Sequence, residues 1–406
     1  MITIDLIPAS YGDTLLLSIL PKEKTETFIL VDCGMKYAKS ILPVIMNLKN
    51  AGKKLDRFIV THYDKDHILS AARFIKANGK STEEKIITID QVWLNTYRHL
   101  QPESWPVALM PEEIKTVERF MEIQDDLEQE DEGSEINAEQ AMFLGRELLA
   151  GGYTWNTDFD KKAVCIENGR VIFINEDVKI TLLSPTMAAL KKLKEEFEMV
   201  FTAKGIPLTS DQLIDDAYEL FIQQSGRRED MDDEHLISGT GTITKENIRK
   251  WSKGENYDAD SAAANGSSIA FQLEADGKKI LMLADAHAET IMAEIKAVYG
   301  EDAGYPIIFE AIKVAHHGSF RNNCPDLFKL IDSPKYLFST NGKHQSHVHP
   351  DIETIAMIIN RPPTKQVPER ELTFNHVLPH LKGLENEDLK TTFHYSVKMQ
   401  TFITLP

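Results

Sequence analysis

Short apolar runs recur along the first hundred residues, and stretches with a helical spacing of apolar positions lie between them. The runs predict β-strands over residues 2–7, 14–20, 28–31, 58–60 and 87–94. Amphipathic spacing predicts helices over residues 37–50 and 67–77. Each is expected to end there because a glycine, Gly52 or Gly79, follows shortly after. Strands that alternate with helices in this way are typical of an α/β layer.

Strand patterns return in the second half of the chain, after two long helical segments. They predict strands over residues 171–173, 178–183, 269–273, 280–283, 307–314, 336–339 and 393–405. The helical segments define two insertions, near residues 98–150 and 186–262, in a single domain of residues 1–406. Their composition does not indicate independent domains, so we expect lids over a site built by the strand ends. The first insertion is very acidic between residues 122 and 139, a pattern interpreted as a solvated face.

The 406 residues carry a formal net charge of -18, and 42% of them are hydrophobic, enough for a large core. The acidic balance argues against broad electrostatic binding to nucleic acid, whose affinity comes mostly from Lys and Arg on phosphates. The three cysteines are scattered and form no CxxC pair, which disfavours a disulfide framework or a zinc finger. No stretch approaches the ~18–20 apolar residues of a membrane span, and no leader pattern precedes the first strand. We therefore expect a cytoplasmic protein without membrane attachment.

The candidate chemistry centres on a run of six residues, His62-Tyr63-Asp64-Lys65-Asp66-His67, directly after the strand of residues 58–60. Two imidazoles and two carboxylates this close together are costly to bury unless a cation compensates them. The run is either a polar loop after a strand or a metal site, and its spacing alone leaves both interpretations open.

Three later predicted strands also end in residues that bind metals or transfer protons. Asp285 ends the first of them, and the pair His316-His317 ends the second. The third strand is followed by His344, His347 and His349. Because functional groups of open sheets gather at strand ends, these ends and the histidine–aspartate run favour one shared site.

In these motifs the chain resembles the metallo-β-lactamase superfamily. The resemblance rests on Val31-Asp32-Cys33-Gly34, where an Asp closes a strand before a small residue and Gly, and on the HxDxDH run of residues 62–67. Asp64 in place of the usual middle His is typical of the branch that includes the soluble domain of the competence protein ComEC and phosphorylcholine esterases. Further motifs of that branch are Gly12-Asp13-Thr14-Leu15-Leu16, Leu182-Leu183-Ser184-Pro185, Asn265-Gly266-Ser267-Ser268, Asp285, His316-His317-Gly318-Ser319 and His349-Pro350.

The resemblance implies an α/β fold, a four-layer αββα sandwich of two mixed sheets with helices outside. It also implies two divalent ions, zinc or manganese, that share a bridging Asp285. The expected ligands of the two ions are His62 and Asp64 for one and Asp66, His67 and His316 for the other. No histidine matches the superfamily's third motif, so the first position would bind weakly or prefer a harder ion such as manganese. Because His67 begins a predicted helix, the helix dipole would disfavour its imidazolium form.

The same resemblance implies a hydrolase whose metal-bound hydroxide attacks a phosphodiester. The expected catalytic residues are Asp66, His317 and His349, and the expected substrate contacts are Asn265, Ser268 and Ser319. The substrate would be a small molecule or a short nucleic acid, because the net charge of -18 disfavours a long polyanion. Two alternatives remain open: a hydrolase of an amide, lactam or thioester, and a metal-poor interaction protein that binds a protein partner through its acidic insertions.

Overall fold

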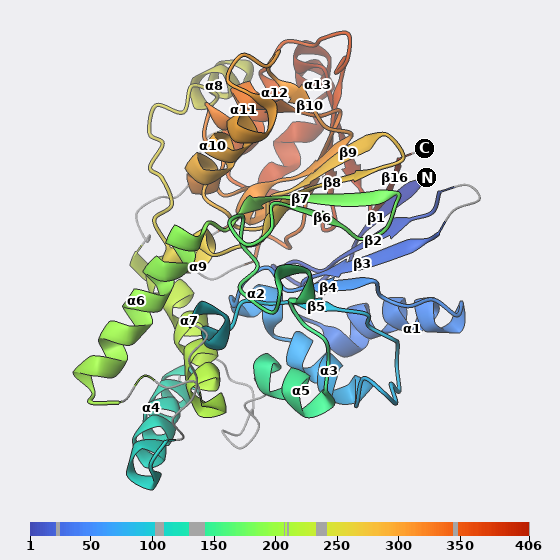
Figure 1. The fold of residues 1–406 in the computed structure, drawn as a ribbon. Helices are drawn as coiled ribbons and strands as arrows, with labels where there is room; N and C mark the ends of the chain where they lie inside the picture. Colours follow the sequence, from blue (N-terminus) through green and yellow to red (C-terminus); the bar gives the residue numbers. More distant parts are fainter. Residues whose placement is uncertain are drawn as a thin grey trace.

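The structure is a computed structural model and describes residues 1–21, 25–101, 109–129, 143–206, 208, 211–232, 242–343 and 348–405. Two sheets lie face to face, and helices cover the outer face of each (Figure 1). Within the described residues, one sheet has the strand order β16-β1-β2-β3-β4-β5 and the other β15-β14-β13-β11-β9-β8-β7-β6. The predicted four-layer αββα sandwich is confirmed.

The first sheet combines strands from the start of the chain with the last strand. Its strands are β1 (Ile2–Leu6), β2 (Leu15–Ile19), β3 (Thr27–Val31), β4 (Arg57–Ile59), β5 (Val92–Trp93) and β16 (Phe402–Leu405). β3, β4 and β5 are parallel, whereas β16, β1, β2 and β3 are antiparallel neighbours. The predicted strand of residues 87–94 is reduced to β5, because Ile89 makes only an isolated bridge to Leu55.

Helices on the outer face of the first sheet are α1 (Leu42–Asn50), α2 (Lys65–Ile68) and α3 (Ala71–Asn78). A π-helical turn, Tyr37–Ile41, precedes α1. The single helix predicted over residues 67–77 is divided into α2 and α3 at Ser70, because the Ser70 N–H donates to the carbonyl oxygens of Cys33 and Gly34. This division ties the histidine–aspartate run to the end of β3.

The second sheet is antiparallel at one edge and parallel over the rest. Its strands are β6 (Val171–Phe173), β7 (Val178–Ser184), β8 (Ala270–Ala275), β9 (Lys278–Met282), β11 (Ala311–Lys313), β13 (Lys335–Phe338), β14 (Arg370–Phe374) and β15 (Tyr395–Met399). β6 to β9 are antiparallel neighbours, and β9, β11, β13, β14 and β15 are parallel.

Two long strands predicted in this half of the chain are each divided. The run of residues 307–314 forms β10 (Ile307–Ile308), which pairs with β12 (Ile331–Asp332) outside the main sheets, and then β11. The run of residues 393–405 forms β15 in the second sheet and β16 in the first. The chain crosses from one sheet to the other between these two strands, so one continuous strand is excluded.

Helices α8 (Lys245–Trp251), α10 (Ala288–Tyr299), α11 (Leu327–Leu330), α12 (Ile352–Ile359) and α13 (Glu387–Phe393) lie on the outer side of the second sheet (Figure 1). The buried apolar residues form three main layers, one between the sheets and one beneath the helices on each side. The middle layer contains residues of both sheets, such as Leu17 of β2 and Phe271 of β8. It therefore holds the two sheets together.

The two predicted insertions pack on one another beside the first sheet (Figure 1). The helices that do so are α4 (Pro111–Gln129), α5 (Leu144–Gly151), α6 (Met187–Ala203) and α7 (Gln212–Asp232), whereas α8 of the second insertion packs on α12 of the other side. Phe197 of α6 and Tyr218 of α7 are buried in the same apolar cluster as residues of α3 and β4. Salt bridges from Arg98 and Arg146 to two aspartates of α7 join the insertions. The acidic positions from residue 130 to 139 lie outside the described residues, and the expected role as lids stays a prediction.

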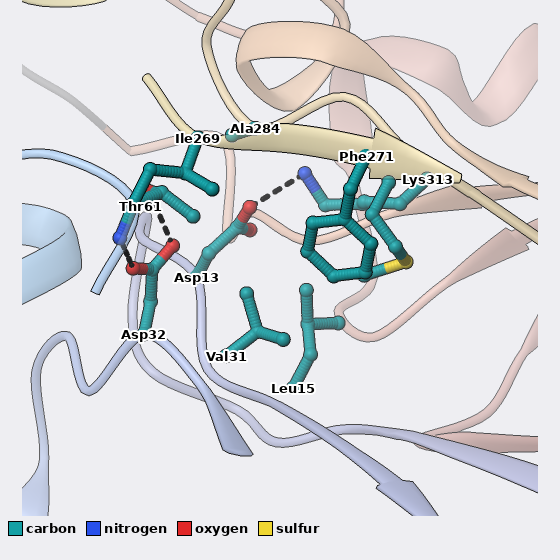
Figure 2. Close-up of a pocket in the computed structure, with 10 residues that line it drawn as sticks. Asp13, Leu15, Val31, Asp32, Thr61, Ile269, Phe271, Ala284 and Lys313 are labelled. Carbon is teal, nitrogen blue, oxygen red and sulfur yellow. Dashed lines mark hydrogen bonds and ion pairs between the residues drawn. The ribbon is translucent and has the colours of Figure 1, made fainter. Parts of the chain in front are cut away.

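A buried ion pair joins the two sheets. Lys313, the last residue of β11, places its Nζ 2.6 Å from Asp13 Oδ2, and Asp13 lies in the loop between β1 and β2. Both residues are at most 1% exposed. Figure 2 shows the pair facing a small cavity between the sheets that is otherwise lined mostly by apolar side chains. When one member of a buried ion pair is removed, the other charge stays buried without compensation, and the folded state loses stability.

Lys313→Met should therefore lower the free energy of unfolding by about 3–5 kcal/mol, because the buried Asp13 carboxylate would lose its ion-pair partner. Lys54→Met is the matched control, since the Lys54–Asp90 pair lies at the surface with side chains 50% and 37% exposed. Its loss should be below about 1 kcal/mol. Urea titrations of both variants measure the two losses, and equal losses would contradict this account of the buried pair.

Glu219 of α7 is buried at the start of α5. Its Oε1 accepts a hydrogen bond from the Leu144 N–H at 3.0 Å. Burial raises the pKa of Glu219 to about 8 against the opposing effect of this hydrogen bond. Because the folded-state pKa lies above the unfolded one, the stabilisation is fully present below about pH 4.3 and is lost as the pH rises through 8.

Glu219→Gln should have the same free energy of unfolding as the wild type near pH 4 and a higher one, by at least about 1 kcal/mol, near pH 9. Denaturant titrations at the two pH values measure this difference. Glu195→Gln, at an exposed position of α6, is the control and should leave the pH dependence unchanged. A Glu219→Gln effect of the same size at both pH values would argue against a buried titrating carboxyl.

Candidate metal centre

The histidine–aspartate run meets the ends of three other strands at one place between the sheets. Asp32 follows β3, His62 lies just after β4, Asp285 follows β9 and His316 follows β11. The backbone is left-handed near three of these ends, with φ of 58° at Asp32, 45° at Ala284 and 44° at His316. Residues other than glycine adopt this conformation at a free-energy cost, which is characteristic of functional sites.

Asp285 lies in the middle of the cluster. Its Oδ2 is 3.4 Å from His67 Nε2 and 3.7 Å from the Nε2 atoms of both His62 and His316. Asp64 adds a second carboxylate, with its Oδ2 3.3 Å from His62 Nε2. Asp285 therefore has the central position that its predicted bridging role requires. That Asp285 binds an ion stays a prediction.

Several ligand-type atoms of the cluster are buried and have no hydrogen-bond partner. These atoms are His62 Nε2, His67 Nε2, Asp64 Oδ1 and Asp285 Oδ1. Buried polar atoms are nearly always paired, so unpaired atoms that converge are the arrangement expected of a cation site. Ligand atoms of His62, His67 and Asp285 lie within 4.8 Å of one another, which fits a divalent ion.

The charges of the cluster shift its protonation equilibria. Burial opposes ionisation of Asp285, but His67 and His316 outweigh it and hold the pKa of Asp285 well below its usual range. Burial also opposes the imidazolium form of His67, but Asp285, Asp66 and Asp32 raise its pKa well above the usual value. The prediction that the helix dipole would disfavour the imidazolium form of His67 is therefore wrong. The effect of three nearby carboxylates on the pKa of His67 exceeds that of the dipole of one short helix. A divalent cation would replace the His67 proton as the compensating charge.

Hydrogen bonds behind the imidazoles direct their Nε2 atoms into the cluster. His67 Nδ1 is 2.8 Å from Asp32 Oδ2, and His62 Nδ1 is 3.0 Å from Thr61 Oγ1. Thr61 also donates to the Asp32 carboxylate through its N–H and its hydroxyl, at 2.7 and 2.8 Å. Because a carboxylate only accepts, Asp32 holds the proton of His67 on Nδ1 and leaves Nε2 for a ligand.

Asp66 and His317 form another side of the cluster. Asp66 Oδ2 is 2.9 Å from His317 Nε2 and 3.6 Å from His67 Nε2. His317 Nδ1 donates to the Ser339 carbonyl at 2.8 Å and lies 3.4 Å from Asp13 Oδ1. Burial opposes the charged form of His317, but Asp13 and Asp66 outweigh it and raise its pKa to about 10.

The structure brings together the six predicted ligands His62, Asp64, Asp66, His67, Asp285 and His316. The contacts within the predicted second set differ from the expected ones, because Asp66 contacts His317 whereas His316 contacts Asp285. Asp66, His67 and His317 form a further group whose ligand atoms lie within 4.8 Å. Which ligand binds which ion stays a prediction.

The residues predicted to contact the substrate or transfer protons lie next to this cluster. Ser268 Oγ and Asn265 Oδ1 are buried without a hydrogen-bond partner. Ser319 is buried, and its N–H donates to the His316 carbonyl. The His349 ring is centred 5.3 Å from the His316 ring, and burial lowers the pKa of His349. The other histidines considered in that segment, His344 and His347, lie outside the described residues.

Four residues beside the cluster are not predicted from the sequence as functional: Thr61, Asp260, Lys313 and Asn322. Lys313 carries a readable signal, since it and Glu310 are the two charged residues inside a predicted apolar strand. Asp260 and Asn322 belong to polar loops that give no such signal, and only the fold brings them next to His316.

A two-sheet sandwich with histidines and aspartates gathered at its strand ends is the arrangement of a metal-binding protein, and one comparison with known families points the same way. The family described as the metallo-beta-lactamase superfamily matches residues 22–137, which include β3, β4 and the histidine–aspartate run. The superfamily consists mostly of metal-dependent hydrolases. The matched segment covers less than half of the 406 residues, and it contains Asp32 and the histidine–aspartate run, on which the resemblance rests.

A search of curated proteins gives no match. One similar solved structure is that of "Zn(2+)-bound PqqB from Methylobacterium extorquens", with 9% sequence identity and a TM-score of 0.35 over 100% of each chain. Among the described residues, no helix is both long and apolar enough to cross a membrane.

Asp285→Asn keeps the shape of the side chain but removes its charge. We expect at least about tenfold weaker metal binding and loss of at least one ion per chain, because repulsion between two cations would no longer be screened. Metal analysis of the purified variant measures the loss, and circular dichroism checks that the sheets still form. Asp276→Asn, in the β8–β9 turn with a side chain 48% exposed, is the control.

The alternative role for Asp285, an N-cap of the following helix, is excluded by the structure because α10 has His287 at its N-cap. Wild-type metal content in the Asp285→Asn protein would contradict the role of Asp285 as a ligand.

Proposed function

We propose that this protein is a metal-dependent hydrolase that cleaves phosphodiester bonds. The observation that carries the proposal is the convergence of three imidazole Nε2 atoms on the Asp285 carboxylate, with buried ligand-type atoms left unpaired. A degenerate fold that serves only as an interaction protein has no need to keep such costly groups together.

One or two divalent ions, zinc or manganese, would be held by His62, Asp64, Asp66, His67, Asp285 and His316. Bound there, such ions supply a water of lowered pKa and a positive charge for an anionic substrate. The mixture of imidazole and carboxylate ligands suits either metal, because nitrogen favours zinc and oxygen favours manganese. Asp32 and Thr61 keep the Nε2 atoms of His67 and His62 directed at the ions.

His317 is the residue best placed to hold a proton near the reacting atoms. Its Nδ1 proton is engaged by the Ser339 carbonyl, so Nε2, now 2.9 Å from Asp66 Oδ2, is the nitrogen that can donate to a leaving oxygen. The Asp13 carboxylate, 3.4 Å from His317 Nδ1, favours the protonated form of this imidazole. Asp66 would accept the proton of the attacking water or orient His317.

The proposed substrate contacts differ in what they offer. The Asn265 amide nitrogen already donates to Asp260, so its remaining group is the acceptor Oδ1. An acceptor suits a water or a hydroxyl group rather than a phosphate oxygen. Ser268 and Ser319 carry hydroxyl groups that can donate, and these are the better candidates for contacts with a phosphate oxygen.

The anionic centre of a diester would be compensated by the ions and by His317, whereas neutral amides and thioesters make less use of these charges. The net charge of -18 adds a long-range repulsion towards polyanions, which favours a small diester or a short nucleic acid over a long one.

Activity assays on protein stripped with chelator and reloaded with zinc or manganese test the proposal. We expect turnover of bis(4-nitrophenyl) phosphate by the reloaded protein, loss of that turnover after chelation, and its return with one of the two metals. Generic lactam and thioester substrates are assayed in parallel, and the Asp285→Asn variant reports background hydrolysis. Turnover of a lactam or thioester without turnover of any diester would overturn the substrate class, and a chain that binds no metal would overturn the hydrolase.

A further inference from the structure

A buried chain of hydrogen bonds leads from His316 to the segment that returns from the second insertion. His316 Nδ1 lies 2.9 Å from Asn322 Oδ1, and Asn322 Nδ2 donates to Asp260 Oδ2 at 2.7 Å. Asn322 is 0% exposed and Asp260 9% exposed. Neither residue contacts a metal-ligating atom directly, so their effect on the site must act through His316.

The carboxylate of Asp260, at the far end of this series of hydrogen bonds, determines which group is the donor at each step. A carboxylate accepts hydrogen bonds and does not donate them, so Asn322 must turn its NH₂ group towards Asp260. The Asn322 carbonyl oxygen is then the atom that faces His316 and can only accept. His316 must therefore carry its proton on Nδ1, which leaves the Nε2 lone pair facing Asp285 at 3.7 Å.

Asp260 is itself held in place by further donors. Its Oδ1 accepts from the Ala262 N–H at 2.9 Å, and its Oδ2 also accepts from Asn265 Nδ2 at 2.8 Å. Burial opposes ionisation of Asp260, but the three hydrogen bonds that it accepts from Ala262, Asn265 and Asn322 favour the carboxylate. Asp260 is thus a fixed carboxylate at neutral pH.

The orientation of Asn322 has a second support. Its Nδ2 also lies 3.1 Å from the carbonyl oxygen of Asp285, which likewise only accepts. If the amide were rotated, two acceptors would face the Asn322 oxygen and the Asn322 NH₂ would face His316 Nδ1. His316 would then carry its proton on Nε2, a form that has no lone pair for a metal ion.

We propose that Asp260 and Asn322 are positioning residues that hold His316 in the tautomer able to bind a metal ion. The inference rests on the proposed metal centre and goes beyond it by naming two residues, outside the ligands, that determine the affinity of the site. It also connects the end of the second insertion, where Asp260 lies, to the geometry around Asp285.

Asp260→Asn tests the proposal, because a neutral amide at this position accepts or donates and no longer dictates the orientation of Asn322. We expect about tenfold weaker cobalt or zinc binding, the range found for partners behind metal-ligating histidines. Asn322→Ala should weaken metal binding to a similar extent, because His316 Nδ1 then loses the acceptor that holds its proton. Competition with a chromophoric chelator gives the affinities, and the visible spectrum of the cobalt protein reports ligation by His316.

Asn323→Ala is the matched control. Asn323 is also 0% exposed, and it donates to the carbonyl oxygens of Ala315 and Ser319 in the same turn without contacting the His316 ring. Its loss should lower the thermal stability of the apo protein and leave the metal affinity of the folded protein unchanged. All affinities are measured on protein whose circular dichroism matches the wild type.

Wild-type affinity in the Asp260→Asn protein would overturn the positioning role while leaving the hydrolase proposal intact. The same conclusion would follow if Asn322→Ala bound metal with wild-type affinity, or if Asn323→Ala reduced the affinity as much as Asp260→Asn. Absence of metal binding in the wild-type protein is a different result, which would overturn the proposed function and this inference with it.

Discussion

The buried contact between Asp13 and Lys313 is the interaction on which the geometry of the site depends. It joins a loop of the first sheet to the end of β11 in the second, three residues before His316. Asp13 also bonds through its backbone to Asp66, and its other carboxylate oxygen lies 3.4 Å from His317. One residue thus links the histidine–aspartate run, the end of β11 and the interface between the sheets, so any relative shift of the sheets would be felt at the cluster.

The same region concentrates more negative charge than its protein partners compensate. Asp13, Asp32 and Asp285 are each 1% exposed, and Lys313 is the neighbouring permanent cation that balances the first of them. The histidines could balance the others only as imidazolium, which would occupy the lone pairs that face Asp285. Divalent ions remove this conflict, because they compensate the carboxylates and use the lone pairs at the same time. The charge distribution is therefore consistent with the proposed metal centre.

The sequence predicts the local parts of this architecture and misses the parts that depend on distant partners. The candidate ligands of residues 62–67 are suggested by their spacing together with the later strand ends, and most strands follow from apolar runs. The pattern of residues 393–405 does not say that one half pairs with β14 and the other with β1, because periodicity specifies a strand but not its neighbour. Nor does spacing separate His316 from His317, since their different contacts come from left-handed backbone at both residues, which non-glycine sequence rarely signals.

The second helical insertion approaches the candidate site from two directions. Tyr63, inside the histidine–aspartate run, packs edge-on against Tyr218 of α7 with ring centroids 6.1 Å apart. Asp260 reaches His316 from the end of the same insertion through Asn322. A displacement of α7 would therefore act on the side chains either side of Tyr63, while a displacement of the returning segment would act on the His316 tautomer. Both routes end on proposed ligands of the metal centre, so the second insertion would influence the affinity of that centre if it binds an ion.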